Sequence, residues 1–72
     1  MEPMGLTLRL QRHSGLTQNE RYLRDYILRY PGQAARMNAR ELARASFTSP
    51  SAVIRFCQKF GCRGWKDFKA EL

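Results

Sequence analysis

The polar side chains that could recognise a partner are concentrated between residues 49 and 59. Ser49, Ser51 and Gln58 can both donate and accept hydrogen bonds. Arg55 carries a planar fork of donors that matches the acceptors of a guanine edge or a phosphate, whereas Lys59 is a point charge suited to phosphate. The candidate site residues are therefore Ser49, Ser51, Ala52, Arg55, Gln58 and Lys59.

The sequence lacks the groups that an enzyme would need to break covalent bonds. A serine nucleophile requires a base within hydrogen-bond reach, and the single histidine, His13, is remote in sequence from Ser49 and Ser51. The carboxylates are scattered singly, and no glycine-rich phosphate loop is present. Cys57 and Cys62, with His13 far away, do not make a convincing zinc ligand set. We therefore expect no enzyme activity, no metal and no cofactor.

The charge of the chain favours a polyanionic partner. Its 72 residues include 13 Lys and Arg against 6 Asp and Glu, which gives a net charge of +7. Between residues 36 and 69 the only acids are Glu41 and Asp67, and the basic residues are Arg36, Arg40, Arg44, Arg55, Lys59, Arg63, Lys66 and Lys69. Nucleic acid is the first candidate partner and an anionic membrane surface the second. The alternative is a solvated face whose charge only maintains solubility.

The elements around these residues have the layout of a helix-turn-helix. Asn38 and Glu41 predict a capped short helix over about 39–45, and 46–48 form a break. Ser49 and Pro50 then suit the N-cap and first position of a second helix, which Gly61 ends. The apolar stripe of that helix, at helical spacing, is Val53, Phe56, Cys57 and Phe60. Ile54 lies at the margin, where it could finish the core or contact a thymine methyl group.

The remaining segments predict further helices. Thr17 and Glu20 form a capping box before a helix with an apolar stripe of Tyr22, Leu23, Tyr26, Ile27 and Tyr30, which we assign to the core. Residues 33–37 suit a turn or short helix, a last helix begins near Trp65, and 6–12 favour helix over strand. The expected fold is all-α, a small bundle of four to five helices containing a helix-turn-helix.

The sequence pattern divides the chain into two parts. Residues 1–15 are an N-terminal segment that we expect to be helical in part and to take part in dimerisation, and residues 16–72 are the helix-turn-helix domain. Leu6, Leu8 and Leu10 are interrupted by Arg9 and do not form a signal peptide, and no apolar run spans a bilayer. We expect a cytoplasmic protein that does not bind membranes, with Cys57 as a core residue.

Several blocks of residues resemble one known family. They are residues 16–20 (LTQNE), 25–28 (DYIL), 41–43 (ELA), 49–61 (SPSAVIRFCQKFG) and 64–69 (GWKDFK). Together they are similar to the N-terminal domain of RpiR/MurR-type bacterial transcription regulators, and the similarity covers residues 16–72. The last two blocks are the most specific.

The resemblance implies operator binding, homodimers, and a C-terminal sugar-isomerase-type domain that senses phosphosugars. No such sensor domain fits in 72 residues, so we expect an isolated DNA-binding domain whose effector acts only through the missing part. Sugar or sugar-phosphate metabolism is the implied pathway, and the residues do not distinguish a repressor from an activator. The DNA-facing positions that the resemblance implies are Ser49, Ser51, Ala52, Arg55 and Lys59.

One departure from the family's pattern falls in the turn. Phe47 and Thr48 stand where the family has glycine and an aliphatic residue. A left-handed backbone there costs a bulky residue about 1 kcal/mol or more. Phe47 is expected either to pack into the core or to lie exposed.

Two functions follow from the sequence. The first is sequence-specific binding of double-stranded DNA by a transcription regulator. The alternative is a helical protein-interaction or dimerisation module with incidental charge, motivated by Leu6, Leu8, Leu10 and Leu16. Salt-sensitive binding to duplex DNA distinguishes the first from the second.

Overall fold

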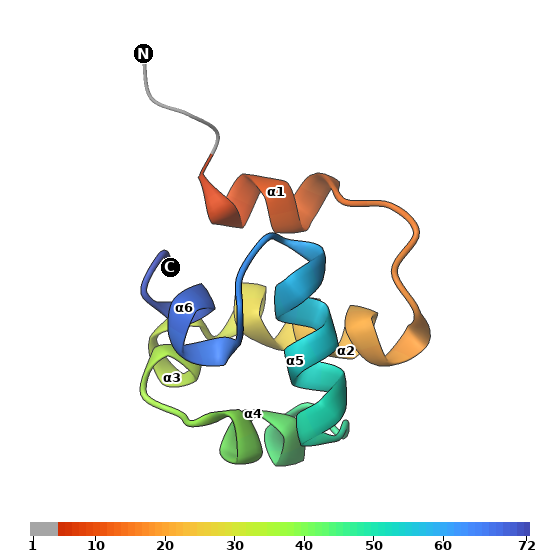
Figure 1. Ribbon diagram of the computed structural model, residues 1–72. Helices are drawn as coiled ribbons and strands as arrows, with labels where there is room; N and C mark the ends of the chain where they lie inside the picture. Colours follow the sequence, from red (N-terminus) through yellow and green to blue (C-terminus); the bar gives the residue numbers. More distant parts are fainter. Residues whose placement is uncertain (1–4) are drawn as a thin grey trace.

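Six helices and no strand make up the computed structural model, which describes residues 5–72. The helices are α1 (Leu6–Arg12), α2 (Gln18–Arg29), α3 (Pro31–Ala35), α4 (Ala39–Ala45), α5 (Pro50–Lys59) and α6 (Trp65–Lys69). Figure 1 shows α2 passing behind α5, with α1 at one end of α5 and α4 at the other. The all-α prediction is confirmed, and the number exceeds five because Pro31 begins a short helix of its own.

Local capping explains where the central helices begin. Thr17 accepts a hydrogen bond from the Glu20 amide, and the Glu20 carboxylate accepts one from the Thr17 amide. Asn38 and Glu41 repeat this reciprocal arrangement at the start of α4. These bonds satisfy amides that have no partner within the first turn of a helix. Both predicted capping boxes are therefore present.

The helices pack around one apolar core. Leu23 and Ile27 of α2, Leu42 of α4, and Val53 and Phe56 of α5 are at most 1% exposed. An aromatic cluster extends this core towards α6, with ring centroids 5.0 Å apart for Phe56 and Phe60 and 5.4 Å apart for Trp65 and Phe68. Pairs at such distances contribute beyond their buried area. The core thereby fixes the inner face of α5.

The predicted core stripe of α2 was wrong at two tyrosines. Tyr22 is 45% exposed and Tyr30 is 40% exposed, whereas Tyr26 is half-buried. Tyr22 immediately precedes Leu23, and one residue rotates a helical side chain by about 100°, which turns Tyr22 away from the core. Tyr30 lies beyond the last helical turn, as the C-cap of α2.

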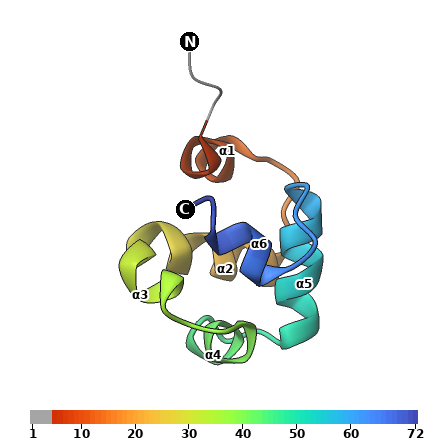
Figure 2. The ribbon, with the colours of Figure 1, turned by 60° about the vertical axis from the view of Figure 1, so that its left-hand side comes forward.

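Helix α1 is tied to the far end of α5. Leu10 is fully buried in the common core, and the Arg9 guanidinium donates to the Phe60 carbonyl at 3.0 Å. Arg9 also lies over the Phe60 ring, 5.8 Å from its centroid. Figure 2, turned from the view of Figure 1, shows α1 above the rest of the bundle. Among the described residues, no helix combines the length and apolar composition needed to cross a bilayer.

Candidate nucleic-acid interface

Helix α5 presents a polar face to solvent opposite its buried face. Ser51, Arg55 and Gln58 are all exposed, and their spacing of four and three residues puts them on one side of the helix. Val53, Phe56 and Cys57 on the other side are fully buried. Because the buried face is fixed by the core, the polar face is presented in one rotational setting.

Two other predicted site residues lie at the start of α5. The Ser49 hydroxyl accepts a hydrogen bond from the Ala52 amide at 3.2 Å, so Ser49 is the N-cap of the helix. Its proton is still free to donate elsewhere, since the cap uses the oxygen only as an acceptor. Ala52 is half-buried at the edge of the polar face. The six predicted site residues therefore lie on one short helix and its N-cap.

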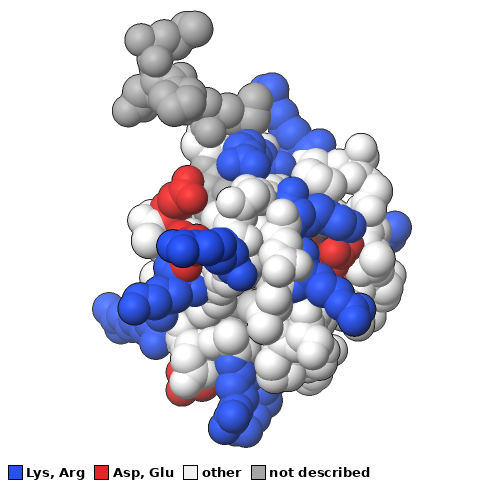
Figure 3. All heavy atoms as spheres, in the orientation of Figure 1, with Lys and Arg blue, Asp and Glu red and all other residues white. Residues whose placement is uncertain are grey.

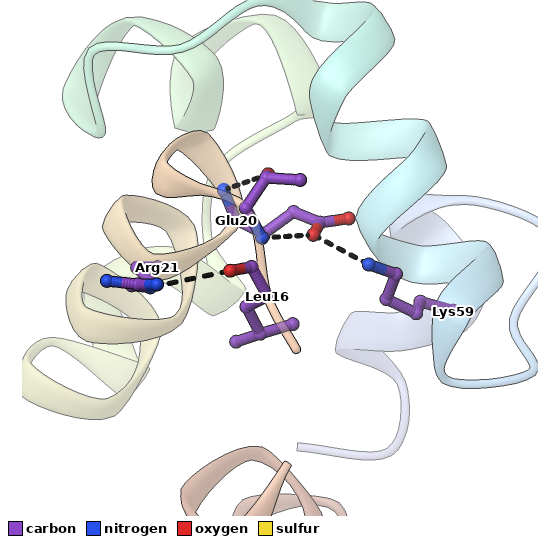
Figure 4. A network of polar contacts seen from close by, with 5 residues as sticks. Leu16, Glu20, Arg21 and Lys59 are labelled. Carbon is purple, nitrogen blue, oxygen red and sulfur yellow. Dashed lines mark hydrogen bonds and ion pairs between the residues drawn. The ribbon is translucent and has the colours of Figure 1, made fainter. Parts of the chain in front are cut away.

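Lys59 differs from the other five because its ammonium group is bound within the molecule. Its Nζ donates to Glu20 Oε1 at 2.7 Å, and the same oxygen accepts from the Thr17 amide at 2.7 Å (Figure 4). The Lys59 side chain is 35% exposed and that of Glu20 is 8% exposed. A lysine has three donors, so this contact leaves others available.

The charge of Glu20 is stabilised by these contacts. Burial acts to raise the pKa of the Glu20 carboxyl, but the hydrogen bonds from Lys59 and Thr17 outweigh it and leave the pKa below its ordinary value. The carboxylate is therefore ionised at neutral pH and binds α2 to α5.

A small hollow separates the N-terminus of α2 from the polar face of α5. It is lined by Thr17, Asn19, Glu20, Ala52 and Arg55. The arginine of the polar face thus lies beside the amide end of α2. Amide groups at the start of a helix carry a partial positive charge. The ionised Glu20 carboxylate in the same hollow offsets this partial charge, so Arg55 is the exposed cation of this edge.

The turn before α5 has a strained residue at its centre. Phe47 has φ 60° and is 86% exposed, so of the two open alternatives the exposed one is found. The Phe47 amide bonds to Arg44 O at 3.3 Å and the Thr48 amide to Ala43 O at 2.8 Å, the Schellman arrangement that ends a helix. Buried Ser46 donates to Leu42 O at 2.7 Å and pairs with the Thr48 hydroxyl at 3.0 Å. These bonds hold the turn in a left-handed conformation without glycine.

Helix α6 packs against α5 and is itself anchored to the segment before α4. Trp65 Nε1 and Lys69 Nζ both donate to the Met37 carbonyl, at 2.8 and 3.1 Å. This carbonyl immediately precedes Asn38, the N-cap of α4. The two bonds therefore join α6 to the segment that leads into α4. Because α4 and α6 both pack against α5, these bonds help to fix the two helices beside it.

Basic side chains surround the face on which α5 lies. Figure 3, in the orientation of Figure 1, shows lysines and arginines around the edge of this face, with acidic side chains in only a few places. Among the exposed basic residues near α5 in the chain are Arg40 and Arg44 of α4, Arg55 of α5 itself, Arg63 in the turn after α5, and Lys66 of α6. A polyanion that contacts α5 would meet positive charge on both sides.

Comparison with known proteins decides between the possible helical bundles. The family model described as "Helix-turn-helix domain, rpiR family" matches residues 4–72. The chain belongs to this rpiR family. The assignment confirms the resemblance expected from the sequence, and this rpiR-family domain is a DNA-binding domain of the type found in transcription regulators.

Individual relatives agree with the family assignment. The rpiR-family domain is 37% identical over 68 residues to the uncharacterised HTH-type transcriptional regulator YfhH of Escherichia coli, covering 94% of this chain and 24% of YfhH. It is 37% identical over 57 residues to the uncharacterised HTH-type transcriptional regulator YbbH of Bacillus subtilis, covering 79% of this chain and 20% of YbbH. The chain thus spans about a quarter or less of the length of these curated relatives.

A solved structure has the same fold. The crystal structure of the N-terminal domain of the transcriptional regulator ybbH from Bacillus subtilis superposes with a TM-score of 0.85 at 33% identity, covering 90% of this chain and 80% of that chain. The rpiR-family domain therefore shares the fold of the N-terminal domain of a regulator.

Two features of the rpiR-family domain were not predicted from the sequence. The capping box at Glu20 was recognised, but its ion pair with Lys59 was not, because that contact joins residues 39 positions apart. The donors on Met37 O were missed for the same reason, since 28 and 32 positions separate them from this carbonyl. The available signal was spacing, because Glu20 precedes Leu23 by three positions and Ile27 by seven and so falls on the buried stripe of α2, where a carboxylate needs a partner.

Proposed function

We propose that this domain binds a specific sequence of double-stranded DNA by inserting α5 into the major groove. The observation that carries the proposal is the exposed face of Ser51, Arg55 and Gln58 on a helix whose rotation is fixed. The major groove is about 12 Å wide and admits one helix. Arg55 would bond to a guanine, Ser51 and Gln58 to base edges or phosphates, and Ser49 to either. Ala52 would permit close approach.

Phosphate contacts would supply the affinity that does not depend on sequence. Lys59 remains a candidate for one of them, with its Glu20 contact intact, and the net charge of +7 favours such binding. A basic side chain that contacts a phosphate displaces a counterion bound to the DNA. The association constant would therefore fall steeply as the salt concentration rises. An interaction module with incidental charge would not show this dependence on salt.

We also propose that the domain acts as a homodimer on a palindromic operator. Half-sites one helical turn apart on such an operator are separated by about 34 Å. Two adjacent copies would therefore place their α5 helices in successive major grooves on one side of the duplex. The N-terminal segment, residues 1–15, is the candidate for the pairing surface.

The wider role that we propose is regulation of sugar or sugar-phosphate metabolism in the cytoplasm. It rests on membership of the rpiR family, and a phosphosugar effector would act through a domain outside these 72 residues. The domain itself would carry no enzyme activity. Transcription would be repressed where such an operator overlaps a promoter.

Selection of duplexes from random sequence with the purified domain tests this proposal. Enrichment of one palindromic sequence, with an affinity that rises as salt is lowered, supports DNA recognition by a dimer. Enrichment of no sequence, with binding that survives high salt, would favour the protein-interaction module instead.

A further inference from the structure

Ile54 is the one large apolar residue that α5 exposes. It is 44% exposed, although its neighbour Val53 is fully buried and Phe56 and Cys57 complete the core face. It lies outside the core cluster, so the alternative that it finishes the core does not apply. Scattered exposed apolar residues are common on protein surfaces. What distinguishes Ile54 is its place within an otherwise polar, DNA-facing surface.

The neighbours of Ile54 on the helix are hydrogen-bonding groups. Ser51 is three residues before it and Gln58 four residues after it, so the three side chains adjoin along one side of α5. Arg55 is the next residue and is exposed beside them. An aliphatic side chain in this position cannot pair with a polar base edge. It matches the one apolar group in the major groove, the C5-methyl group of thymine.

The surroundings of Ile54 fit a DNA strand. It lines a hollow with Asn38, Ala39, Arg63, Gly64, Trp65, Lys66 and Lys69. The wall of this hollow is apolar at Ala39 and Trp65, and its rim is basic. Lys66 is exposed there, and Arg63, which is exposed beside it and paired with Asp67 through Nε, has further donors, so both could bond to phosphates of the strand whose base meets Ile54.

We infer that Ile54 determines specificity by packing on the methyl group of a thymine in each operator half-site. The inference rests on the proposed function, because it needs α5 in the major groove. A β-branched side chain has few rotamers, so Ile54 loses little conformational entropy in making the contact. The hydrogen-bonding residues of α5 would then read polar edges while Ile54 selects for thymine.

The test replaces each thymine of the selected operator, one at a time, by deoxyuridine. This change removes only the C5-methyl group and preserves base pairing. At one position per half-site, the dissociation constant of the wild-type domain should rise about fourfold, as expected for the loss of one buried methyl group. Ile54→Ala should bind the thymine and uracil duplexes equally, whereas Ile54→Val should retain part of the difference.

A matched control is available elsewhere in the chain. Leu72 is also an exposed aliphatic residue, at 38%, so Leu72→Ala removes a comparable apolar side chain outside both α5 and the proposed pairing surface. It should leave the thymine-to-uracil ratio unchanged. Circular dichroism verifies that each variant is folded, and the exposure of both side chains makes unfolding by either change unexpected.

The outcomes separate this inference from the proposed function. If the wild-type domain prefers the operator to a scrambled duplex but no uracil substitution weakens it, the assignment of Ile54 is overturned alone. Discrimination that persists in Ile54→Ala overturns it as well. If the operator and the scrambled duplex bind equally, the proposed function fails and this inference fails with it.

Discussion

Glu20 and Lys59 form an ion pair of 2.7 Å between two helices, although 39 positions separate them in the chain. The same carboxylate caps α2, so a single side chain joins the start of that helix to the last turn of α5. The pair therefore helps to set the position of the helix that we propose enters DNA.

Glu20→Gln should lower the stability of the domain. Glutamine keeps the shape of the side chain and can still accept from the Thr17 amide, so the change removes mainly the charge that pairs with Lys59. We expect the free energy of unfolding to fall by about 1 kcal/mol, measured by urea denaturation at pH 7. Asp67→Asn is the control, because the Arg63–Asp67 pair is exposed at 92% and 42% and should contribute little. Equal losses for both variants would contradict this account.

The contribution of Glu20 should depend on pH. Burial raises the pKa of this carboxyl, but the bonds from Lys59 and Thr17 lower it further, so the folded value lies below the unfolded value of about 4.3. A depressed pKa stabilises the fold above the unfolded value, and this stabilisation is lost as pH falls through the folded value. The difference in stability between wild type and Glu20→Gln should therefore shrink below about pH 4. A difference that stays constant from pH 7 to pH 3 would disprove the linkage.

Mutations at two equivalent positions, just after α4 and just after α5, should change the stability of the domain in opposite directions. Phe47 and Gly61 occupy the same position of the same helix-ending motif, with φ 60° and 82°. Phe47→Gly relieves the left-handed strain, partly offset by the greater freedom of glycine in the unfolded chain, and should stabilise by about 0.5 kcal/mol. Gly61→Ala should destabilise by about 1 kcal/mol through backbone strain alone, because no atom lies within 4 Å of the added Cβ.

Thermal unfolding of the two variants provides the measurement. Phe47→Gly should raise Tm and Gly61→Ala should lower it. A shift of the same sign in both would show that Phe47 is stabilised by contacts that its 86% exposure does not reveal.

Arg55 and Lys59 should differ in what they contribute to DNA binding. Arg55→Ala should cost about 1–3 kcal/mol on the selected operator and relax the preference at one base pair. Lys59→Ala should weaken all duplexes alike and reduce the dependence of affinity on salt. It leaves the buried Glu20 carboxylate without its partner, so it is measured at a temperature where the variant is fully folded. Equal losses on every sequence from both variants would refute the assigned roles.

The two cysteines should be unreactive in the folded domain. Both thiols are free and buried, and burial, with a smaller effect of Cys62, raises the pKa of Cys57 to about 12. Burial, with Glu71 and Asp67 nearby, also raises the pKa of Cys62. The thiolate is the reactive form, so iodoacetamide at pH 8 should modify neither residue until the domain is unfolded in urea. Mass spectrometry of the native protein would disprove this if it found alkylated Cys57.

Local signals predicted much of this structure. The capping residues Thr17, Asn38 and Ser49 are N-caps as expected, and the apolar spacing of Val53, Phe56 and Cys57 identified the buried face of α5. Such signals act within one or two helical turns, so they can be read along the chain.

Contacts between distant segments could not be read in this way. Periodicity assigned Tyr22 to the core, but no neighbouring helix buries it, and its exposure depends on the packing of the whole bundle. The same limit applied to Ile54, which periodicity left at the margin of the core. It applied also to Lys59, whose partner Glu20 lies on another helix. Candidate residues on one helix could be found together, whereas the supporting contacts from other helices could not.

The most direct test of the central claim is a titration of the purified domain with the selected operator and a scrambled duplex of the same composition, over a range of salt concentrations. The account predicts that the operator binds at least about 10³-fold more tightly at physiological salt, and that both affinities fall as salt rises. Equal affinity for the two duplexes at every salt concentration would contradict sequence-specific recognition by α5.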